Sequence, residues 1–106
     1  MGYCFGGSTV IELALGGTAL AAAVSFHGGL DDLALGDASS IKARMLVCTG
    51  ADDPLVPVTA GRDTAQHIKG AQLMVIDGMA HDLPPGLLPK LVEAIASHCK
   101  KIRVSV

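Results

Sequence analysis

The sequence predicts an α/β fold, in which about three parallel strands carry flanking helices. Short aliphatic runs at 22–27, 45–49 and 72–76 have the length and composition of strands buried on both faces. Stretches that favour helix alternate with them, at 8–15, at about 58–68 and at about 87–99. Because strand and helix alternate, we expect parallel strands joined by right-handed crossovers.

Glycines and small polar residues set the expected ends of these elements. Gly16-Gly17 should end the first helix, and Lys69-Gly70 the second. Thr59 is a candidate N-cap of the second helix. The acidic segment 30–40 is expected to be a solvated loop, since its carboxylates (Asp31, Asp32 and Asp37) lack the spacing of a calcium loop.

Length and charge narrow the classes of function. At 106 residues the chain is expected to be a single domain over 1–106. The formal net charge is -2, with no basic stripe, so nucleic acid is not an expected partner. The apolar stretch 18–26 is too short to span a bilayer, and a cytoplasmic protein is the default expectation. The three cysteines predict free thiols, with neither a disulfide framework nor a metal site.

The most informative stretch is Gly2-Tyr3-Cys4-Phe5-Gly6-Gly7. It has the form of a nucleophile elbow, a sharp strand-to-helix turn in which only glycine fits beside the nucleophile. A thiol at a helix start is shifted toward thiolate, its reactive form. An elbow also needs a strand before it, and we expect that strand to be missing here.

A thiol nucleophile needs a base, and the base needs a carboxylate. Strand ends supply both, because the carboxyl ends of parallel strands meet at one edge of a sheet. His81 is the candidate base and Asp53 the candidate acid, although Asp52 competes with Asp53. Cys4, Asp53 and His81 then follow the order nucleophile, acid, histidine.

These motifs resemble the dienelactone hydrolase family of α/β-hydrolases. The resemblance is carried by the elbow, by Val24-Ser25-Phe26-His27-Gly28-Gly29-Leu30 and by Gly50-Ala51-Asp52-Asp53-Pro54-Leu55-Val56-Pro57, and it is looser beyond Val58. It implies a partial α/β-hydrolase fold, with about the first half of the family fold missing. It also implies a Cys4-Asp53-His81 triad acting on a small ester or lactone, with the Phe5 N–H in the oxyanion hole and no metal or organic cofactor.

Other candidate residues have plainer interpretations. His27 and Tyr3 could line the site, although His27 is better explained as a histidine bonded to backbone at a strand end. Cys48 and Cys99 are expected to be packing residues. His67 and His98, near helix C-termini, are expected to face solvent.

A second functional class stays open beside the hydrolase. The chain could be a non-catalytic truncated fragment or subunit, which associates through an exposed sheet edge. Its partner would then be a second copy of the chain or a complementing N-terminal half.

Overall fold

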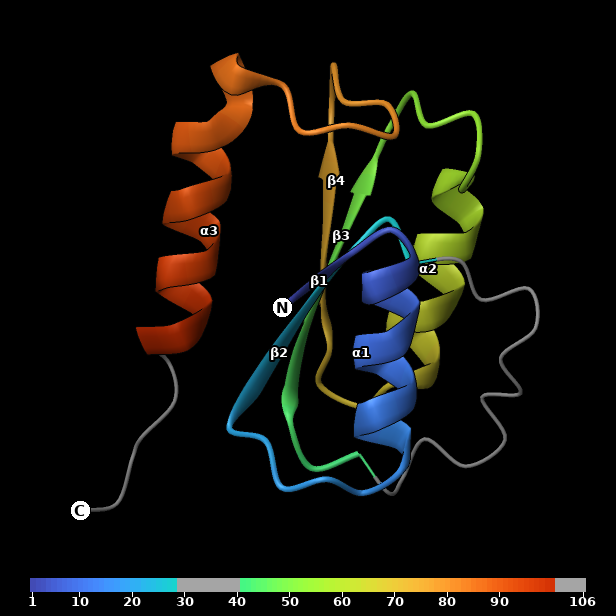
Figure 1. Cartoon of the computed structure of the whole chain (residues 1–106), viewed down its shortest axis with the longest axis vertical. Coiled ribbons are helices and arrows are strands. Elements are labelled where there is room, and N and C mark those ends of the chain that lie inside the picture. Colours follow the sequence, from blue (N-terminus) through green and yellow to red (C-terminus); the bar gives the residue numbers. More distant parts are fainter. Residues whose placement is uncertain (29–40, 101–106) are drawn as a thin grey trace.

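A computed structural model describes residues 1–28 and 41–100. Its centre is a four-stranded sheet in the order β1-β2-β3-β4, and every neighbouring pair is parallel (Figure 1). The strands are β1 (Gly2–Tyr3), β2 (Ala22–Phe26), β3 (Arg44–Gly50) and β4 (Gln72–Ile76). The expected parallel α/β fold is confirmed. The expectation that the strand before the elbow is missing is wrong. A short strand is present, because Gly2 and Tyr3 pair with Ser25 and Phe26.

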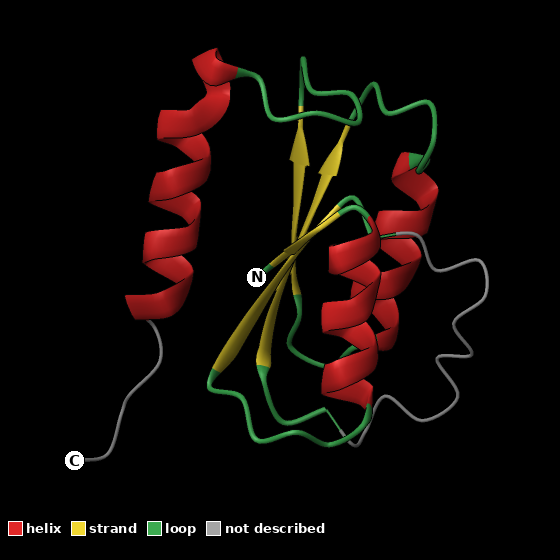
Figure 2. Ribbon diagram, viewed as in Figure 1, coloured by secondary structure: helices red, strands yellow, loops and turns green. Residues whose placement is uncertain are grey.

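Helices cover both faces of this sheet. The helices are α1 (Phe5–Leu15), α2 (Val58–His67) and α3 (Leu88–Lys100), with a short 3-10 turn, η2 (Pro85–Leu87), before α3. Helices α1 and α2 lie on one face and α3 on the other (Figures 1 and 2). Helix α2 starts after Pro57 rather than at a Thr59 cap, so that predicted cap is wrong. None of the described helices is long and apolar enough to cross a membrane.

Each face of the sheet carries its own apolar cluster, because side chains alternate along a strand. One cluster packs β2, β3 and β4 against α3, and its buried members are Val24, Phe26, Leu46, Cys48, Ile76, Met79 and Leu91. The other lies under α1, and its buried members are Ile11, Ala14, Ala23, Ala43, Met45 and Ile68. The two clusters fix the strand ends that carry the candidate site residues.

The environments predicted for His98 and Cys99 are wrong. His98 is 1% exposed rather than solvent-facing, and its Nε2 donates to the Arg44 carbonyl across 3.0 Å. Cys99 is exposed, whereas Cys48 is buried as expected, and burial raises the pKa of the Cys48 thiol to about 12. His67 is exposed as predicted. The predicted loop carboxylates Asp31, Asp32 and Asp37 lie outside the described residues.

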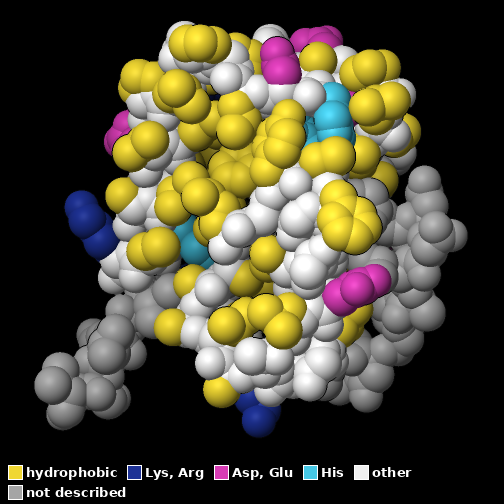
Figure 3. Space-filling view, viewed as in Figure 1, with side chains coloured by type: hydrophobic (Ala, Val, Ile, Leu, Met, Phe, Trp, Pro, Cys, Tyr) yellow, Lys and Arg dark blue, Asp and Glu magenta, His cyan; other side chains and the backbone are white. Residues whose placement is uncertain are grey.

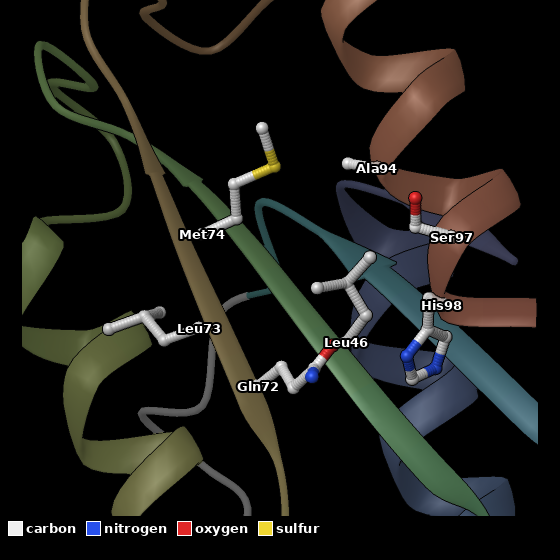
Figure 4. A pocket seen from close by; sticks show the side chains of 7 residues that line it. All are labelled: Leu46, Gln72, Leu73, Met74, Ala94, Ser97 and His98. Atoms are coloured by element: carbon white, nitrogen blue, oxygen red, sulfur yellow. The ribbon is translucent and has the colours of Figure 1, made fainter. Parts of the chain in front are cut away.

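A pocket of about 470 Å³ lies between α3 and the strands β3 and β4 (Figure 4). Its lining comprises Leu46, Gln72, Leu73, Met74, Ala94, Ser97 and His98. None of the site residues expected from the sequence lines this pocket, because Cys4, Asp53 and His81 lie at the strand ends.

Candidate active site

The turn between β1 and α1 holds Cys4 in a strained backbone conformation. Cys4 has φ 57° and ψ −117°, a region that residues with a side chain rarely adopt. The glycines around it are needed for space. A Cβ on Gly2 would collide with the Gly6 carbonyl, and one on Gly7 would lie 2.6 Å from the Phe26 oxygen. The sequence thus folds into a tight elbow with the cysteine at its apex.

Three strand ends bring the predicted residues together. Cys4 follows β1, Asp53 lies in the turn after β3, and His81 lies in the loop after β4. The Cys4 sulfur is 2.8 Å from His81 Nε2, and His81 Nδ1 is 2.9 Å from Asp53 Oδ2. The contacts therefore run without interruption from thiol to imidazole to carboxylate, which is the arrangement that nucleophilic catalysis needs.

The backbone around the acid explains why Asp53 faces His81. Asp53 Oδ1 accepts hydrogen bonds from the backbone N–H groups of Leu55 at 2.8 Å and Val56 at 2.9 Å, so Oδ2 is left to face the imidazole. Asp52 instead accepts a bond from the Gly78 N–H at 3.3 Å. Of the two neighbouring acids, Asp53 is therefore the one in contact with the histidine.

Comparison with known families identifies the family of this chain. A model of the dienelactone hydrolase family matches residues 1–78. The chain belongs to the dienelactone hydrolase family. No curated protein matches it significantly.

Solved structures extend the similarity over nearly the whole chain. A dienelactone hydrolase-like promiscuous phosphotriesterase from metagenomic libraries is 32% identical, with TM-score 0.79, and the match covers 95% of this chain and 50% of that one. A structure titled m3DLH is 29% identical, with TM-score 0.73 and coverage of 97% and 51%. A predicted CIB-like hydrolase from Thermoplasma acidophilum, 24% identical, shares the fold, with TM-score 0.71 and coverage of 94% and 47%. The chain thus spans about half the length of these relatives.

Hydrogen bonding shifts the pKa values along this dienelactone hydrolase-family site. The hydrogen bond with His81 lowers the pKa of the Cys4 thiol, and one from the Phe5 N–H lowers it further, against the effect of desolvation. Hydrogen bonds to Asp53 and then to Cys4 raise the pKa of His81. Burial alone would raise the pKa of Asp53, but hydrogen bonds from Val56, His81 and Leu55 bring it below its usual range. All these shifts favour a thiolate–imidazolium pair beside an ionised carboxylate.

Phe5 and Tyr3 flank Cys4 in different ways. The Phe5 backbone N–H is directed at the Cys4 sulfur, while its side chain is 84% exposed. The Tyr3 hydroxyl donates to the His81 carbonyl at 2.9 Å, and the Tyr3 ring lies 5.9 Å from the His81 ring. Burial, followed by the charges of Cys4, Asp82 and Asp53, raises the pKa of Tyr3. Tyr3 is therefore in contact with the loop that carries His81, and its predicted place in the lining of the site stays a prediction.

His27 belongs to this cluster as well. It is 1% exposed, and its Nδ1 lies 3.1 Å from Asp53 Oδ2. Its Nε2 lies 3.0 Å from the carbonyl oxygen of Asp82, a residue that sequence reasoning did not single out. The only signal for Asp82 in the sequence is that it follows His81. The expectation that His27 bonds to backbone is confirmed, but His27 also contacts the acid.

A metal ion could be held by three of these side chains. The ligand atoms of His27, Asp53 and His81 all lie within 4.8 Å of one another. The proton shared by Asp53 and His81 occupies part of that space, because the two side chains are hydrogen-bonded. A cation would have to displace this proton, so we keep the expectation that the site works without a metal.

Proposed function

We propose that this chain hydrolyses carboxylic esters or lactones, with Cys4 as nucleophile, His81 as base and Asp53 as the acid that orients the base. The observation that carries the proposal is the unbroken line of contacts from Cys4 through His81 to Asp53. Membership of the dienelactone hydrolase family supports the same reaction class. The three cysteines without disulfide bonds also favour a cytoplasmic location.

The first half of the reaction forms an acyl-enzyme. His81 Nε2 takes the Cys4 proton, and the thiolate attacks the substrate carbonyl carbon. The carbonyl oxygen becomes an oxyanion, which accepts a hydrogen bond from the Phe5 N–H. The tetrahedral intermediate collapses as His81 returns the proton to the leaving alkoxide. The alcohol departs, and the acyl group stays on sulfur as a thioester.

The second half releases the acid. His81 removes a proton from water, and the resulting hydroxide attacks the thioester carbonyl. Asp53 stabilises the imidazolium that forms in each half, because its carboxylate accepts the Nδ1–H. Collapse of the second intermediate expels the Cys4 thiolate, which recovers its proton from His81.

The experiment is hydrolysis of 4-nitrophenyl acetate by the purified chain beside its Cys4→Ala variant. The matched control is Cys99→Ala, which removes an exposed thiol from the end of α3. We expect activity in the parent and in Cys99→Ala, and none in Cys4→Ala. Equal activity in parent and Cys4→Ala would refute the proposal. An aryl phosphate triester should be tested alongside, because one relative is a promiscuous phosphotriesterase.

A second candidate function is association through the β1 edge, without catalysis by the chain alone. Strand β1 pairs only with β2, so its outer edge is open in the described part of the chain. Met1 and Phe5 are 80% and 84% exposed beside it. Figure 3 looks toward this edge and shows hydrophobic side chains spread over much of that face. The relatives are twice as long, which suits a partner that extends the sheet.

Light scattering coupled to gel filtration tests this candidate. A second copy covering the edge would give a dimer, and Phe5→Asp should reduce it to a monomer. Leu55→Asp is the matched control, because Leu55 is 71% exposed on the turn after β3. A parent that is monomeric at high concentration and unfolds cooperatively would count against association.

A further inference from the structure

The charged side chains of this chain are divided between the two ends of its parallel strands. The described segments that follow the strands, at 4, 27–28, 51–57 and 77–84, carry no lysine or arginine but four aspartates, namely Asp52, Asp53, Asp77 and Asp82. The described cations lie at or before the starts of β3 and β4 (Lys42, Arg44 and Lys69) or on α2 and α3 (Arg62, Lys90 and Lys100). In Figure 3, acidic side chains lie at the upper end of the molecule near a histidine, whereas the visible basic ones lie at the left and lower margins. The candidate site therefore lies at the acidic end of the sheet.

Two of these carboxylates are held in place by the loop that carries His81. Asp82 Oδ1 accepts a hydrogen bond from the Ala80 N–H at 3.1 Å, and Asp52 Oδ2 accepts one from the Gly78 N–H at 3.3 Å. Among the described residues, no lysine or arginine forms an ion pair with either of them. Their negative charges are therefore fixed beside the site and are not neutralised by a cation.

The proton shared by the candidate triad does not cancel this charge. Cys4 and His81 are 2.8 Å apart, and Asp53 is ionised beside them. The triad has a net negative charge whether the shared proton lies on the sulfur or on the imidazole, and Asp52, Asp77 and Asp82 add to it. The field reaches Tyr3, which precedes Cys4 in the chain. After burial, the charges of Cys4, Asp82 and Asp53 raise the pKa of its hydroxyl.

We propose that the site of this chain takes neutral esters with an apolar acyl chain and selects against anionic ones, with Asp52 and Asp82 as specificity-determining residues. An anionic substrate has to approach Cys4 against these carboxylates, and the strand-end segments offer no lysine or arginine to pair with it. A neutral acyl chain meets apolar surface instead, since Leu55 and Leu83 are 71% and 40% exposed in the same segments. For turnover, this inference rests on the proposed hydrolase function.

Alkylation of Cys4 tests the charge without any turnover. Iodoacetamide and iodoacetate are close in size and differ in charge, so the ratio of their rates reports the potential at the sulfur. Cys99 is exposed, so the chain carries Cys99→Ser. At low salt we expect this ratio to be about tenfold higher at Cys4 than at N-acetylcysteine methyl ester, a neutral thiol. It should fall toward the reference in 1 M NaCl, which screens the carboxylates.

Two isosteric substitutions assign the effect to the named carboxylates. Asp52→Asn and Asp82→Asn remove a charge but keep an oxygen for the Gly78 and Ala80 N–H groups. Together they should lower the ratio at Cys4 by about threefold. The matched control is Asp63→Asn, which removes a 62% exposed carboxylate from α2 and should leave the ratio unchanged. A parent ratio equal to that of the reference thiol, or one that the double variant does not change, would overturn the proposal.

Turnover of three matched esters completes the test. The substrates are 4-nitrophenyl hexanoate, mono-4-nitrophenyl adipate and 4-nitrophenyl 6-aminohexanoate, whose acyl chains have equal carbon counts and end in a methyl group, an anion and a cation. We expect kcat/KM to be about tenfold lower for the adipate than for either of the others. Equal values for adipate and hexanoate would overturn this proposal and leave the hydrolase function standing. Selective alkylation in a chain without Cys4-dependent hydrolysis would uphold the charge selection at Cys4 while the hydrolase function fails.

Discussion

Replacing Asp53 with Asn tests whether the acid fixes the proton on His81. The Asn oxygen has to occupy the Oδ1 position, where the Leu55 and Val56 N–H groups donate at 2.8 and 2.9 Å. The opposite orientation would turn the amide NH₂ toward these two N–H donors, and the lost bond to the buried Val56 N–H alone would cost about 1–3 kcal/mol. The NH₂ therefore faces His81 Nδ1, which must become an acceptor.

The result is the wrong tautomer of the base. With Nδ1 accepting, the ring proton moves to Nε2, the atom 2.8 Å from the Cys4 sulfur. Nε2 can then donate to the sulfur but cannot take the thiol proton. The same change in a serine triad costs about 10⁴ in kcat. A cysteine is intrinsically more nucleophilic, so we expect a fall in kcat/KM of about 10²–10⁴, or roughly 3–5 kcal/mol.

Two assays measure this loss. The first is kcat/KM on 4-nitrophenyl acetate, and the second is the rate of Cys4 alkylation by iodoacetamide at neutral pH. Alkylation is followed in a Cys99→Ser background, because Cys99 is exposed and Cys48 is buried. Circular dichroism confirms the fold. If Asp53→Asn stays within tenfold of the parent in both assays while Cys4→Ala is inert, the tautomer argument is wrong.

Three further outcomes follow from the described contacts. The pKa of Cys4 is lowered and that of His81 is raised. Cys4 should therefore stay a thiolate, and keep its alkylation rate, as the pH falls below the usual thiol pKa of about 8.5. An alkylation rate that decreases as the pH falls through about 8.5 would contradict this. Gly50→Ala should lower the free energy of unfolding, measured by urea denaturation, by about 1–3 kcal/mol and should also slow the alkylation of Cys4. The reason is that its Cβ would collide with the carbonyls of Met79 and Ala80. An unchanged free energy of unfolding and an unchanged alkylation rate would contradict this packing. Dialysis against EDTA should leave hydrolysis unchanged, and a loss restored by zinc would instead indicate a metal site.

The sequence predicts the sheet well because its strands are buried on both faces. Continuous aliphatic runs such as 72–76 leave few alternatives to a central parallel strand, and β4 is observed over Gln72–Ile76. Helix α1 starts at Phe5 rather than Ser8, because the Cys4 carbonyl accepts bonds from the N–H groups of Gly7 and Ser8. Gly6 and Gly7, which the sequence indicates as turn residues, lie in the first turn of the helix.

Tertiary contacts determine the environment of the residues that the sequence misassigned. His98 lies seven positions after the buried Leu91, which is helical spacing, so it shares the buried stripe of α3. Its place near a helix end suggested solvent, but the Arg44 carbonyl gives it a buried partner. Likewise the Asp82 carbonyl reaches His27 across a sequence separation of 55. No local pattern reports such a contact.

The parts of the candidate site are held in place by different contacts. This difference predicts that the specific activity depends on the concentration of the chain. Asp53 and the His81 loop are fixed by backbone bonds and by the close approach of Gly50. Cys4 depends on β1, whose two residues pair on one side only, with one further bond from the Cys4 N–H to the Phe26 carbonyl at 2.8 Å.

An edge strand held by so few hydrogen bonds should open before the rest of the sheet. A second copy docked on the outer edge of β1 would close it and hold Cys4 against His81. Specific activity should therefore rise with chain concentration and reach a plateau as the dimer forms, whereas Phe5→Asp should stay at the low value throughout. Constant specific activity across a monomer–dimer transition would show that β1 needs no partner to present its cysteine.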